Sequence, residues 1–429
     1  MEQAMFKLAE NGTSIRTELL AGLTTYLTMV YIAFVNPSVL ADAGMDKGAV
    51  FVATCLAAAF GSAAMGLLAN YPIAIAPGMG LNAYFTYTLV QGMGLPWQSA
   101  LAAVFASGAL FFVVSVTPLR QWIIDSISPS LKLAIATGIG FFLAFIGLQN
   151  AGLIAPDAAT FVKLGDVKTP AVGIAAAAFI LMAALTARRM HGAILIGILA
   201  AYAAALILGM AEFSGIVAMP PAIAPVFLQM DLGALFDIAM ASVILTLFFV
   251  VLFDNTGTLL GITRAAGMTR PDGSIPNLER ALTADSTSVM AGAALGTSTT
   301  TSYIESAAGV NAGGRTGLTA ITVAVLFLLT LFIAPLAGSI PVFATAPALV
   351  LVGCLMASAA RDIDFDDVTE AVPAAITIIS MPLTFSIADG LAFGFIAYAG
   401  MKLLAGRWRE LPAAVLVLSV LFVLRFALL

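Results

Sequence analysis

Three carboxylic acids lie inside long apolar stretches of the chain, where charged side chains are rare. Asp254 lies in "FFVVLFDNTGTLLGI", Asp285 in "ALTADSTSVM" and Glu305 in "GTSTTTSYIESAAGV". A carboxylate at the centre of a bilayer costs at least about 2.5–3.5 kcal/mol on insertion scales, so such residues tend to be functional. No lysine or arginine lies in the core of these stretches. The pattern favours binding of protons, or of a cationic or N–H-rich solute, over a structural salt bridge. For Asp285, which stands among serines and threonines, a structural role is equally open.

The composition requires a membrane protein. The 429 residues are 61% hydrophobic and 10% charged, and the mean hydropathy is +1.06. A soluble domain could not bury so much apolar surface. The apolar runs are continuous and do not alternate with period two, which excludes an outer-membrane barrel. The first twenty residues lack the pattern of a signal peptide. We therefore expect an all-α polytopic membrane protein.

Two polar stretches interrupt this apolar pattern and offer backbone groups for binding. One is "IAPGMGLNAYFTYTL", residues 75–89, and the other is "GTSTTTSYIESAAGV", residues 296–310. Non-helical backbone at membrane depth is tolerated only where it is buried in protein or lines a cavity. Each stretch predicts a short extended piece followed by a half-helix whose N-terminal amides face the protein centre, where they can bind a solute. The alternative for each is a simple packing kink.

The apolar segments number fourteen and fall into two halves of seven. They lie near 19–38, 50–69, 72–93, 97–117, 130–149, 171–187, 191–210, 235–260, 281–295, 297–312, 315–335, 343–360, 370–386 and 388–404. A Pro-rich loop, "MPPAIAPVF", separates the halves. Because seven is odd, the second half enters from the opposite side, and a repeat would be inverted. Segment 411–428 fits an extra span, a half-span or an interfacial helix.

The basic residues indicate the orientation. With a cytoplasmic N-terminus, the outside segments hold only Lys47, Lys163 and Lys168. The inside segments hold Lys7, Arg16, Arg120, Lys132, Arg188, Arg189, Arg264, Arg270, Arg280, Arg315, Arg361, Lys402, Arg407 and Arg409. This asymmetry follows the positive-inside rule and predicts a cytoplasmic N-terminus.

Further candidate binding residues surround the two interruptions. Asn82 mirrors Glu305 on the other half-helix, and its amide can both donate and accept hydrogen bonds to a heterocycle. Gly80 is assigned to the same site, and the rings of Tyr84, Phe85 and Tyr303 could stack on a flat solute, although membrane aromatics more often serve packing. The single histidine, His191, lies at a span boundary, so no His-based catalytic pair can form. We expect no catalytic residues, no metal site, no cofactor and no enzyme activity.

Several long motifs resemble the adenine–guanine–hypoxanthine permeases, the AzgA-like branch of the nucleobase–cation symporters. They are "RTELLAGLTTYLTMVYIAFVNP", "APGMGLNAYF", "LFDNTGTLLG", "ALTADS", "YIESAAGVNAGGRTGLTA" and "MPLTFSIADGLAFGF". The resemblance covers roughly residues 10–405. It implies two inverted seven-helix repeats divided into a core and a gate domain, often as a homodimer, with a short strand and a half-helix in the third and tenth segments.

The resemblance also implies a function and assigns residues to it. The family takes up purine bases together with protons. Asp254 looks like its carboxylate in the eighth helix, Glu305 like its substrate-binding glutamate in the tenth, and Asn82 like the polar residue of the third element. We expect Glu305 to accept N–H groups of the base. Proton coupling is assigned to Asp254, Glu305 and Asp285, with the proton gradient as the driving force.

These expectations define a complete hypothesis. We expect 1–17 to be a cytoplasmic N-terminus, 18–210 and 235–405 to be the two repeats, 211–234 an external connection and 406–429 a C-terminal hydrophobic segment. The protein would be a multi-pass symporter of the cytoplasmic (inner) membrane, with a purine, protons and lipid as partners and no nucleic acid. The preferred purine stays open. The alternative is a carrier of the same fold for another small solute such as an anion, which two acidic residues in the site would repel.

Overall fold

The computed structural model describes residues 6–117, 127–268 and 275–428. Arg120 and Arg270, two of the basic residues that predict the orientation, and the first five residues of the N-terminal segment lie outside these ranges. Arg264 is described by its backbone alone.

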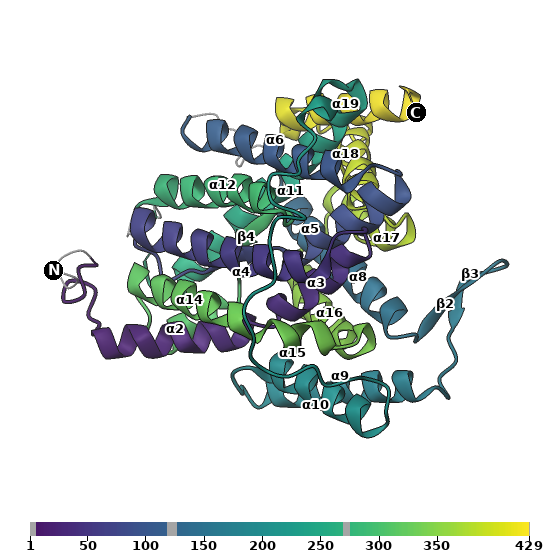
Figure 1. The fold of residues 1–429 in the computed structure, drawn as a ribbon. Helices are drawn as coiled ribbons and strands as arrows, with labels where there is room; N and C mark the ends of the chain where they lie inside the picture. Colours follow the sequence, from purple (N-terminus) through teal and green to yellow (C-terminus); the bar gives the residue numbers. More distant parts are fainter. Residues whose placement is uncertain (1–5, 118–126, 269–274, 429) are drawn as a thin grey trace.

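The first half of the chain forms seven consecutive membrane elements, in the order predicted. Their helices and strands are α2 (Ile15–Met29), α3 (Ile32–Ala41), α4 (Lys47–Ala64), η1 (Met65–Ala69), β1 (Ile75–Pro77), α5 (Met79–Ala83), η2 (Tyr84–Gly92), α6 (Trp97–Ser115), α8 (Pro129–Asn150), α9 (Pro170–Ala187) and α10 (Ala193–Ile207). Between α8 and α9 a hairpin of β2 (Ile154–Asp157) and β3 (Phe161–Leu164) projects from the body of the molecule (Figure 1).

The second half forms another seven elements and one additional helix. They comprise η3 (Leu232–Phe236), α11 (Ile238–Ala265), α12 (Leu278–Leu295), β4 (Thr300–Ser302), α13 (Ser306–Asn311), α14 (Gly317–Thr330), η4 (Leu331–Ile333), α15 (Ala334–Ser339), α16 (Val342–Met356), η5 (Ala357–Asp362), α17 (Val368–Leu383), α18 (Ile387–Leu404), η6 (Trp408–Glu410) and α19 (Ala413–Leu428).

Within the described ranges, nine helices are long and apolar enough to cross a membrane. The other predicted segments are the shorter apolar helices α10 and α17, the more polar α12, and the two interrupted elements around β1 and β4. Both interruptions are therefore confirmed as breaks in the helical pattern. The predicted class, a mostly helical polytopic protein with small strands in the third and tenth segments, is confirmed as well.

The elements pack into two helix bundles. One bundle combines α2–α6 with α11–α15, so that purple α2 and α4 lie beside green α14 (Figure 1). The other combines α8–α10 with α16–α19, through the contacts of α8 with α16 and α17, of α9 with α10 and of α17 with α18. We call them the first and the second bundle. Each draws on both halves of the chain, as the resemblance to a core and a gate domain implies.

Small residues allow the helices within each bundle to approach closely. A Cβ atom on Gly66 would lie 2.6 Å from the carbonyl oxygen of Gly317, where η1 meets α14. A Cβ atom on Gly140 would lie 2.7 Å from the carbonyl oxygen of Gly353, where α8 meets α16. Membrane helices associate by such close van der Waals packing because lipid provides no hydrophobic driving force between them.

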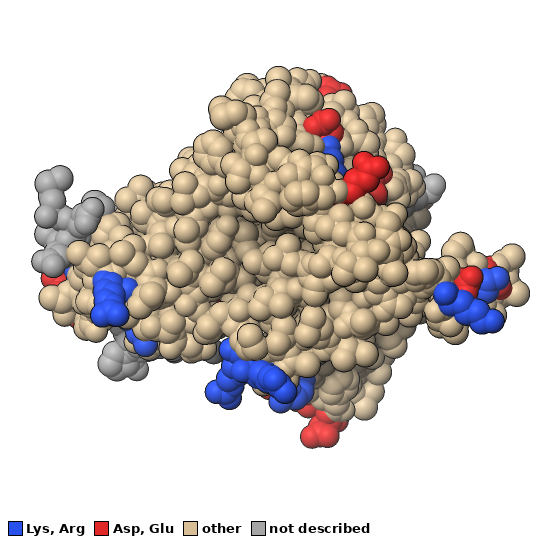
Figure 2. All heavy atoms as spheres, turned by 60° about the horizontal axis from the view of Figure 1, so that its bottom comes forward, with Lys and Arg blue, Asp and Glu red and all other residues tan. Residues whose placement is uncertain are grey.

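The surface agrees with a membrane location. On the face in Figure 2, lysine, arginine, aspartate and glutamate lie towards the edges, and a broad area between them carries no charge. Large apolar side chains are exposed on helices of both bundles, among them Ile180, Val325 and Leu424. Lipid can cover such side chains, whereas water could not solvate so much apolar surface without a large cost in free energy.

Segment 411–428 contains helix α19, which packs against the second bundle. It packs along α18 in the antiparallel direction: Ser419 donates a hydrogen bond of 2.8 Å to the carbonyl oxygen of Phe395, and Arg425 forms a 3.0 Å ion pair with Asp389. Its 16 residues span about 24 Å, less than a hydrocarbon core of about 30 Å. Its contacts with α18 make it part of the second bundle.

Candidate substrate-binding site

The two interrupted elements meet and pair with each other. Strand β1 lies antiparallel to β4, with Ile75 opposite Ser302 and Pro77 opposite Thr300. The pairing extends beyond the strands, because the Gly78 N–H donates to the Thr299 carbonyl at 2.8 Å. Pro77 cannot donate to a helix and the threonines favour extended backbone, so these residues form strands where their neighbours form helices. The pairing satisfies backbone groups that lipid would leave unpaired.

A half-helix follows each strand and begins near the crossing point. Helix α5 starts at Met79, directly after Gly78, and continues as the π-helical η2. Helix α13 starts at Ser306, and Glu305 occupies its N-cap position. The N–H groups of the first turn of such a helix lack intrahelical partners. The arrangement therefore presents two helix N-termini, and Glu305 stands directly at one of them.

Glu305 and Asp254 lie close to each other. Asp254 is on α11, which packs against both β4 and α13, and it interacts electrostatically with Glu305. Both carboxylic acids are half-buried. The hydroxyl of Tyr31, in the break between α2 and α3, donates a 2.8 Å hydrogen bond to Oε1 of Glu305. Among the described residues, no lysine or arginine forms an ion pair with Asp254 or Glu305.

Asp285 lies behind the strand pair and is completely buried. Its two carboxyl oxygens lie 2.9 and 3.0 Å from the hydroxyl of Ser302, so the side chain joins α12 to β4. Asn255, next to Asp254, accepts the Ser302 N–H at 2.9 Å, and its own amide nitrogen is buried without a partner. Asp285 also interacts electrostatically with Asp254. It thus connects the helices and lies near the other two acids, which keeps both of its predicted roles open.

Asn82 is buried in a network that joins four elements. Its amide nitrogen donates to Oδ1 of Asn36 on α3 at 2.5 Å, and its oxygen accepts from the hydroxyl of Ser298. Asn36 in turn donates to Thr54 on α4 at 2.7 Å and to Thr297 at 2.9 Å. The amide nitrogen and the amide oxygen of Asn82 therefore each have a partner within the protein in this conformation, and each can form one further hydrogen bond.

The other predicted residues lie around the same crossing. The hydroxyl of Tyr303 donates to the Pro77 carbonyl at 2.6 Å and so links the end of β4 to the end of β1. Tyr84 and Phe85 are at most 1% exposed, so neither ring has a face open to a solute in this conformation. Gly80 contacts the side chain of Ile139 on α8, at a distance that leaves no room for a Cβ atom. Gly80 therefore lies where the first bundle meets the second.

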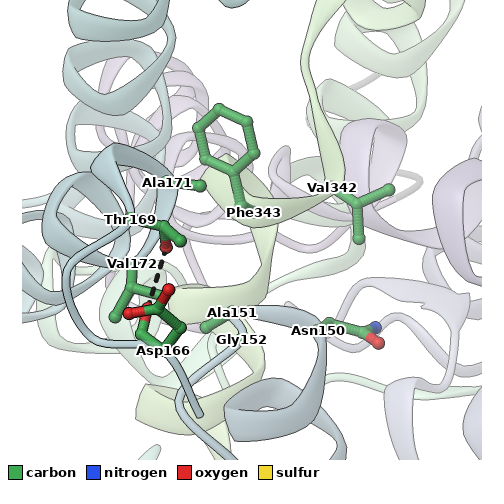
Figure 3. Close-up of a pocket in the computed structure, with 9 residues that line it drawn as sticks. All are labelled: Asn150, Ala151, Gly152, Asp166, Thr169, Ala171, Val172, Val342 and Phe343. Atoms are coloured by element: carbon green, nitrogen blue, oxygen red, sulfur yellow. Dashed lines mark hydrogen bonds between the residues drawn. The ribbon is translucent and has the colours of Figure 1, made fainter. Parts of the chain in front are cut away.

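An open cavity elsewhere shares none of these residues. It has a volume of about 430 Å³ and lies between the C-terminus of α8 and the N-termini of α9 and α16. Figure 3 shows its lining, with Asn150, Asp166 and Phe343 around the opening and the hydroxyl of Thr169 bonded to the Asp166 carbonyl at 3.1 Å. Because it lies apart from the strand crossing and from the acids, we do not assign the site to it.

Sequence reasoning missed three polar residues of the site. Tyr31, Asn36 and Asn255 contact Glu305, Asn82 and Ser302 respectively. Each stands inside an apolar run, and Asn36 directly precedes Pro37. A polar side chain in a segment shielded from water needs a hydrogen-bonding partner within the protein. This need is the signal that could have identified the three residues.

Comparisons with known proteins agree with this geometry. The model of the permease family matches residues 16–393. The chain is 46% identical to the adenine permease AdeP of Escherichia coli over 99% of its length and 96% of that protein. It is 43% identical to the guanine/hypoxanthine permease PbuO of Bacillus subtilis over 99% of its length and all of that protein.

The fold has solved counterparts at low identity. The transmembrane domain of the cyanobacterial bicarbonate transporter BicA superposes with a TM-score of 0.64 at 16% identity, over 90% of this chain and 97% of that domain. The murine anion transporter Slc26a9 superposes with a TM-score of 0.63 at 14% identity, over 92% of this chain and 69% of that one. Both share the inverted-repeat fold. The family match, the relatives and the paired interrupted helices together show that the chain is a membrane transporter, and no enzyme, and belongs to the permease family.

Proposed function

We propose that the protein takes up purine nucleobases across the cytoplasmic membrane together with protons. The observation that carries this proposal is the pairing of the two interrupted elements, with Glu305 at the start of one half-helix and Asp254 beside it. The names of relatives at 43–46% identity over almost the whole chain, adenine and guanine/hypoxanthine permeases, support the substrate class.

The chemistry of the site suits a neutral, N–H-rich ring. In our proposal a carboxylate oxygen of Glu305 accepts ring or exocyclic N–H groups of the base, and half-helix N–H groups bond to its acceptor atoms. Gly80, Asn82 and Asp254 would complete the polar wall, with Tyr84, Phe85 and Tyr303 supplying aromatic surface. The two acids would repel an anion, so the substrates named for the distant fold neighbours do not transfer to this chain.

Proton coupling would use the same acids. Asp254 is the first candidate for the group that binds the coupled proton. It interacts electrostatically with Glu305 and Asp285, which are the other candidates. Within the described ranges, none of the three acids forms an ion pair with a lysine or arginine, so a change of protonation breaks no salt bridge there. The driving force would be the proton gradient, and we expect neither a cofactor nor a bound metal.

Alternating access would arise from movement of the two bundles against each other. On the predicted outer side they are now joined: Thr88 of η2 donates to the Phe385 carbonyl at 2.8 Å, and Asn150 of α8 donates to the Tyr87 hydroxyl at 3.1 Å. The ring of Phe385 also packs edge-on against Tyr87 and Phe142. Opening to that side would break these contacts, whereas the contacts within each bundle could persist.

The proposed topology has residues 1–17 in the cytoplasm and repeats at 18–210 and 235–405. The connection 211–234 would lie outside, and 406–429 would follow the second repeat. The resemblance to the family supports a homodimer, which cross-linking in native membranes would test.

The decisive experiment is uptake of labelled adenine and guanine by cells that lack their own purine permeases. We expect saturable uptake when the chain is expressed, competition by unlabelled purines but not by bicarbonate, and loss of uptake after addition of a protonophore. Saturable uptake that the protonophore does not reduce would contradict only the proton coupling and would leave the substrate assignment in place. Absence of purine uptake by a protein that reaches the membrane would contradict the whole proposal.

A further inference from the structure

We propose that Tyr31 is a positioning residue for Glu305, holding one carboxylate oxygen so that the other faces the substrate. The inference rests on the proposed function. Its first support is the hydrogen bond itself: the Tyr31 hydroxyl lies 2.8 Å from Oε1 of Glu305, across 274 residues of sequence. The hydroxyl bonds to Oε1, so Oε2 is not engaged by Tyr31 and can accept an N–H group of the base.

The backbone fixes the position of Tyr31. The residue lies in the short break between α2 and α3, and its carbonyl accepts hydrogen bonds of 3.0 Å from the N–H groups of both Phe34 and Val35. Its side chain is only 1% exposed. A tyrosine has two side-chain torsions, so a buried ring on an anchored backbone can hold its hydroxyl in one place at a small entropic cost.

Helix α2, which ends two residues before Tyr31, is packed tightly against the half-helix that Glu305 caps. A Cβ atom on Gly309 of α13 would lie 2.7 Å from the Ala21 carbonyl oxygen, so the two helices are in backbone contact. A second contact comes from Thr28, whose hydroxyl lies 3.5 Å from the carbonyl oxygen of Glu305. Tyr31 and Glu305 therefore belong to one rigid unit of the first bundle and should keep their geometry when the bundles move.

The electrostatic surroundings explain why such a contact would be needed. Asp254 and Tyr303 both interact electrostatically with Glu305, and Asp254 repels its charge. A half-buried glutamate has several rotatable bonds and could turn away from a like charge. A hydrogen bond from Tyr31 opposes that rotation, because bonds to a carboxylate are about twice as strong as neutral ones.

The test compares Tyr31 with Tyr26, which lies five residues earlier in α2. Tyr31→Phe removes the hydroxyl and keeps the ring, and Tyr26→Phe is the matched control, since the Tyr26 hydroxyl bonds to Thr330 at 2.7 Å, away from the acids. Initial rates of purine uptake give KM and Vmax, with Vmax divided by the amount of protein at the cell surface. We expect Tyr31→Phe to raise KM about tenfold with Vmax within about twofold of wild type. Tyr26→Phe should leave KM within about twofold.

A double-mutant cycle distinguishes positioning from packing. Equilibrium binding of the purine to purified protein is measured for Tyr31→Phe alone, for Glu305→Gln alone and for the pair. If Tyr31 acts through Glu305, Tyr31→Phe should weaken binding less than about twofold in the Glu305→Gln background. Melting temperatures of all variants in detergent show whether the proteins are folded.

Three results would overturn the inference while purine uptake by the wild type still supports the proposed function. They are an unchanged KM in Tyr31→Phe, an equal weakening of binding in both backgrounds, and a rise of KM in Tyr26→Phe as large as that in Tyr31→Phe. Failure of the wild type to transport purine would instead remove the proposed function and this inference with it.

Discussion

At the scale of single residues, the candidate site contains acids that form no ion pair with a lysine or arginine in the described part of the chain. Asp254 interacts electrostatically with both Glu305 and Asp285. Hydroxyl groups donate to two of the acids, Tyr31 to Glu305 and Ser302 to Asp285. A salt bridge would fix each charge, whereas a hydroxyl can donate to a carboxylate or accept from the neutral acid. The residue chemistry therefore permits a change of protonation without loss of every hydrogen bond.

Replacement of Glu305 by glutamine should impair purine binding. Glutamine keeps the size of the side chain but loses the charge, and hydrogen bonds to charged groups contribute about 1.5–3 kcal/mol, so KM should rise by roughly ten- to a hundredfold. Uptake kinetics in the cells described above measure this. Glu279→Gln, at an exposed position in the first turn of α12, is the matched control and should behave as wild type. Equal KM values for both variants would refute the assignment of Glu305.

A methyl group at Gly80 should disturb the interface between the bundles. Gly80→Ala places a Cβ atom against Ile139, and overpacking of this kind costs about 1–3 kcal/mol. We expect lower uptake and a lower melting temperature, and partial rescue by Ile139→Ala, which removes the opposing side chain. Gly173→Ala serves as control, because its Cβ atom would meet open space. If Gly80→Ala is harmless, or if Ile139→Ala rescues nothing, the close contact does not limit transport.

At the scale of elements, an ionic cluster fixes the predicted cytoplasmic ends of α17 and α18. Lys402, only 1% exposed, lies 2.9 Å from Glu370 and 3.1 Å from Glu410. Arg407 lies 2.6 Å from both Asp367 and Glu410. The cluster thus joins the start of α17, the end of α18 and η6, which leads into α19. A charge buried to this extent is tolerated because several carboxylates surround it.

This cluster predicts a dependence of stability on pH. The Thr369 hydroxyl and the Arg407 guanidinium lower the pKa of Asp367 to about 2, and Arg407, with Lys402, lowers the pKa of Glu410 to about 2. Unfolded carboxyl groups titrate near 4. The two ionised carboxylates therefore contribute fully to the free energy of unfolding above about pH 4, and this contribution is lost as the pH falls towards 2.

Thermal unfolding in detergent as a function of pH measures this effect. The wild type should lose stability between about pH 4 and pH 2, and Arg407→Gln should be less stable above pH 4 and lose less over that interval. Arg409→Gln is the control, because Arg409 stacks on Trp408 instead of pairing with these acids. Identical pH profiles for wild type and Arg407→Gln would show that the cluster does not contribute.

At the scale of the whole molecule, the inverted halves interleave to form the two bundles. An odd number of segments per half reverses the direction of the second half, so that the third and tenth segments approach the crossing from opposite sides. The two strands then meet and pair antiparallel, and a half-helix follows each of them. The proposed binding site lies at this crossing.

The orientation predicts which positions a reagent can reach from outside the cell. After both native cysteines are replaced, Lys163→Cys on the projecting hairpin should react with a membrane-impermeant thiol reagent in intact cells. Arg361→Cys in η5 should react only after permeabilisation. Both positions are exposed, so accessibility in the protein itself is matched. The reverse pattern would place the N-terminus outside.

The sequence by itself determined the class, the order of segments and the two interruptions. Long apolar runs have one stable environment, and Pro77 or the run of threonines before Tyr303 cannot continue a helix well, so local physics decides both features. The three acids could be found in the same way, because charge in an apolar run is costly wherever the chain folds.

Only the tertiary structure decided which groups meet. Tyr31 donates a hydrogen bond to Glu305 across 274 positions of sequence, and Asn82 donates one to Asn36 across 46. Both bonds form because segments distant in sequence pack side by side. No local pattern encodes such a pairing: an apolar helix can bury any of its faces, and the choice depends on the shapes of its neighbours, such as the contact of Gly309 with α2. The packing of α19 on α18 depended in the same way on a distant partner, Asp389 for Arg425.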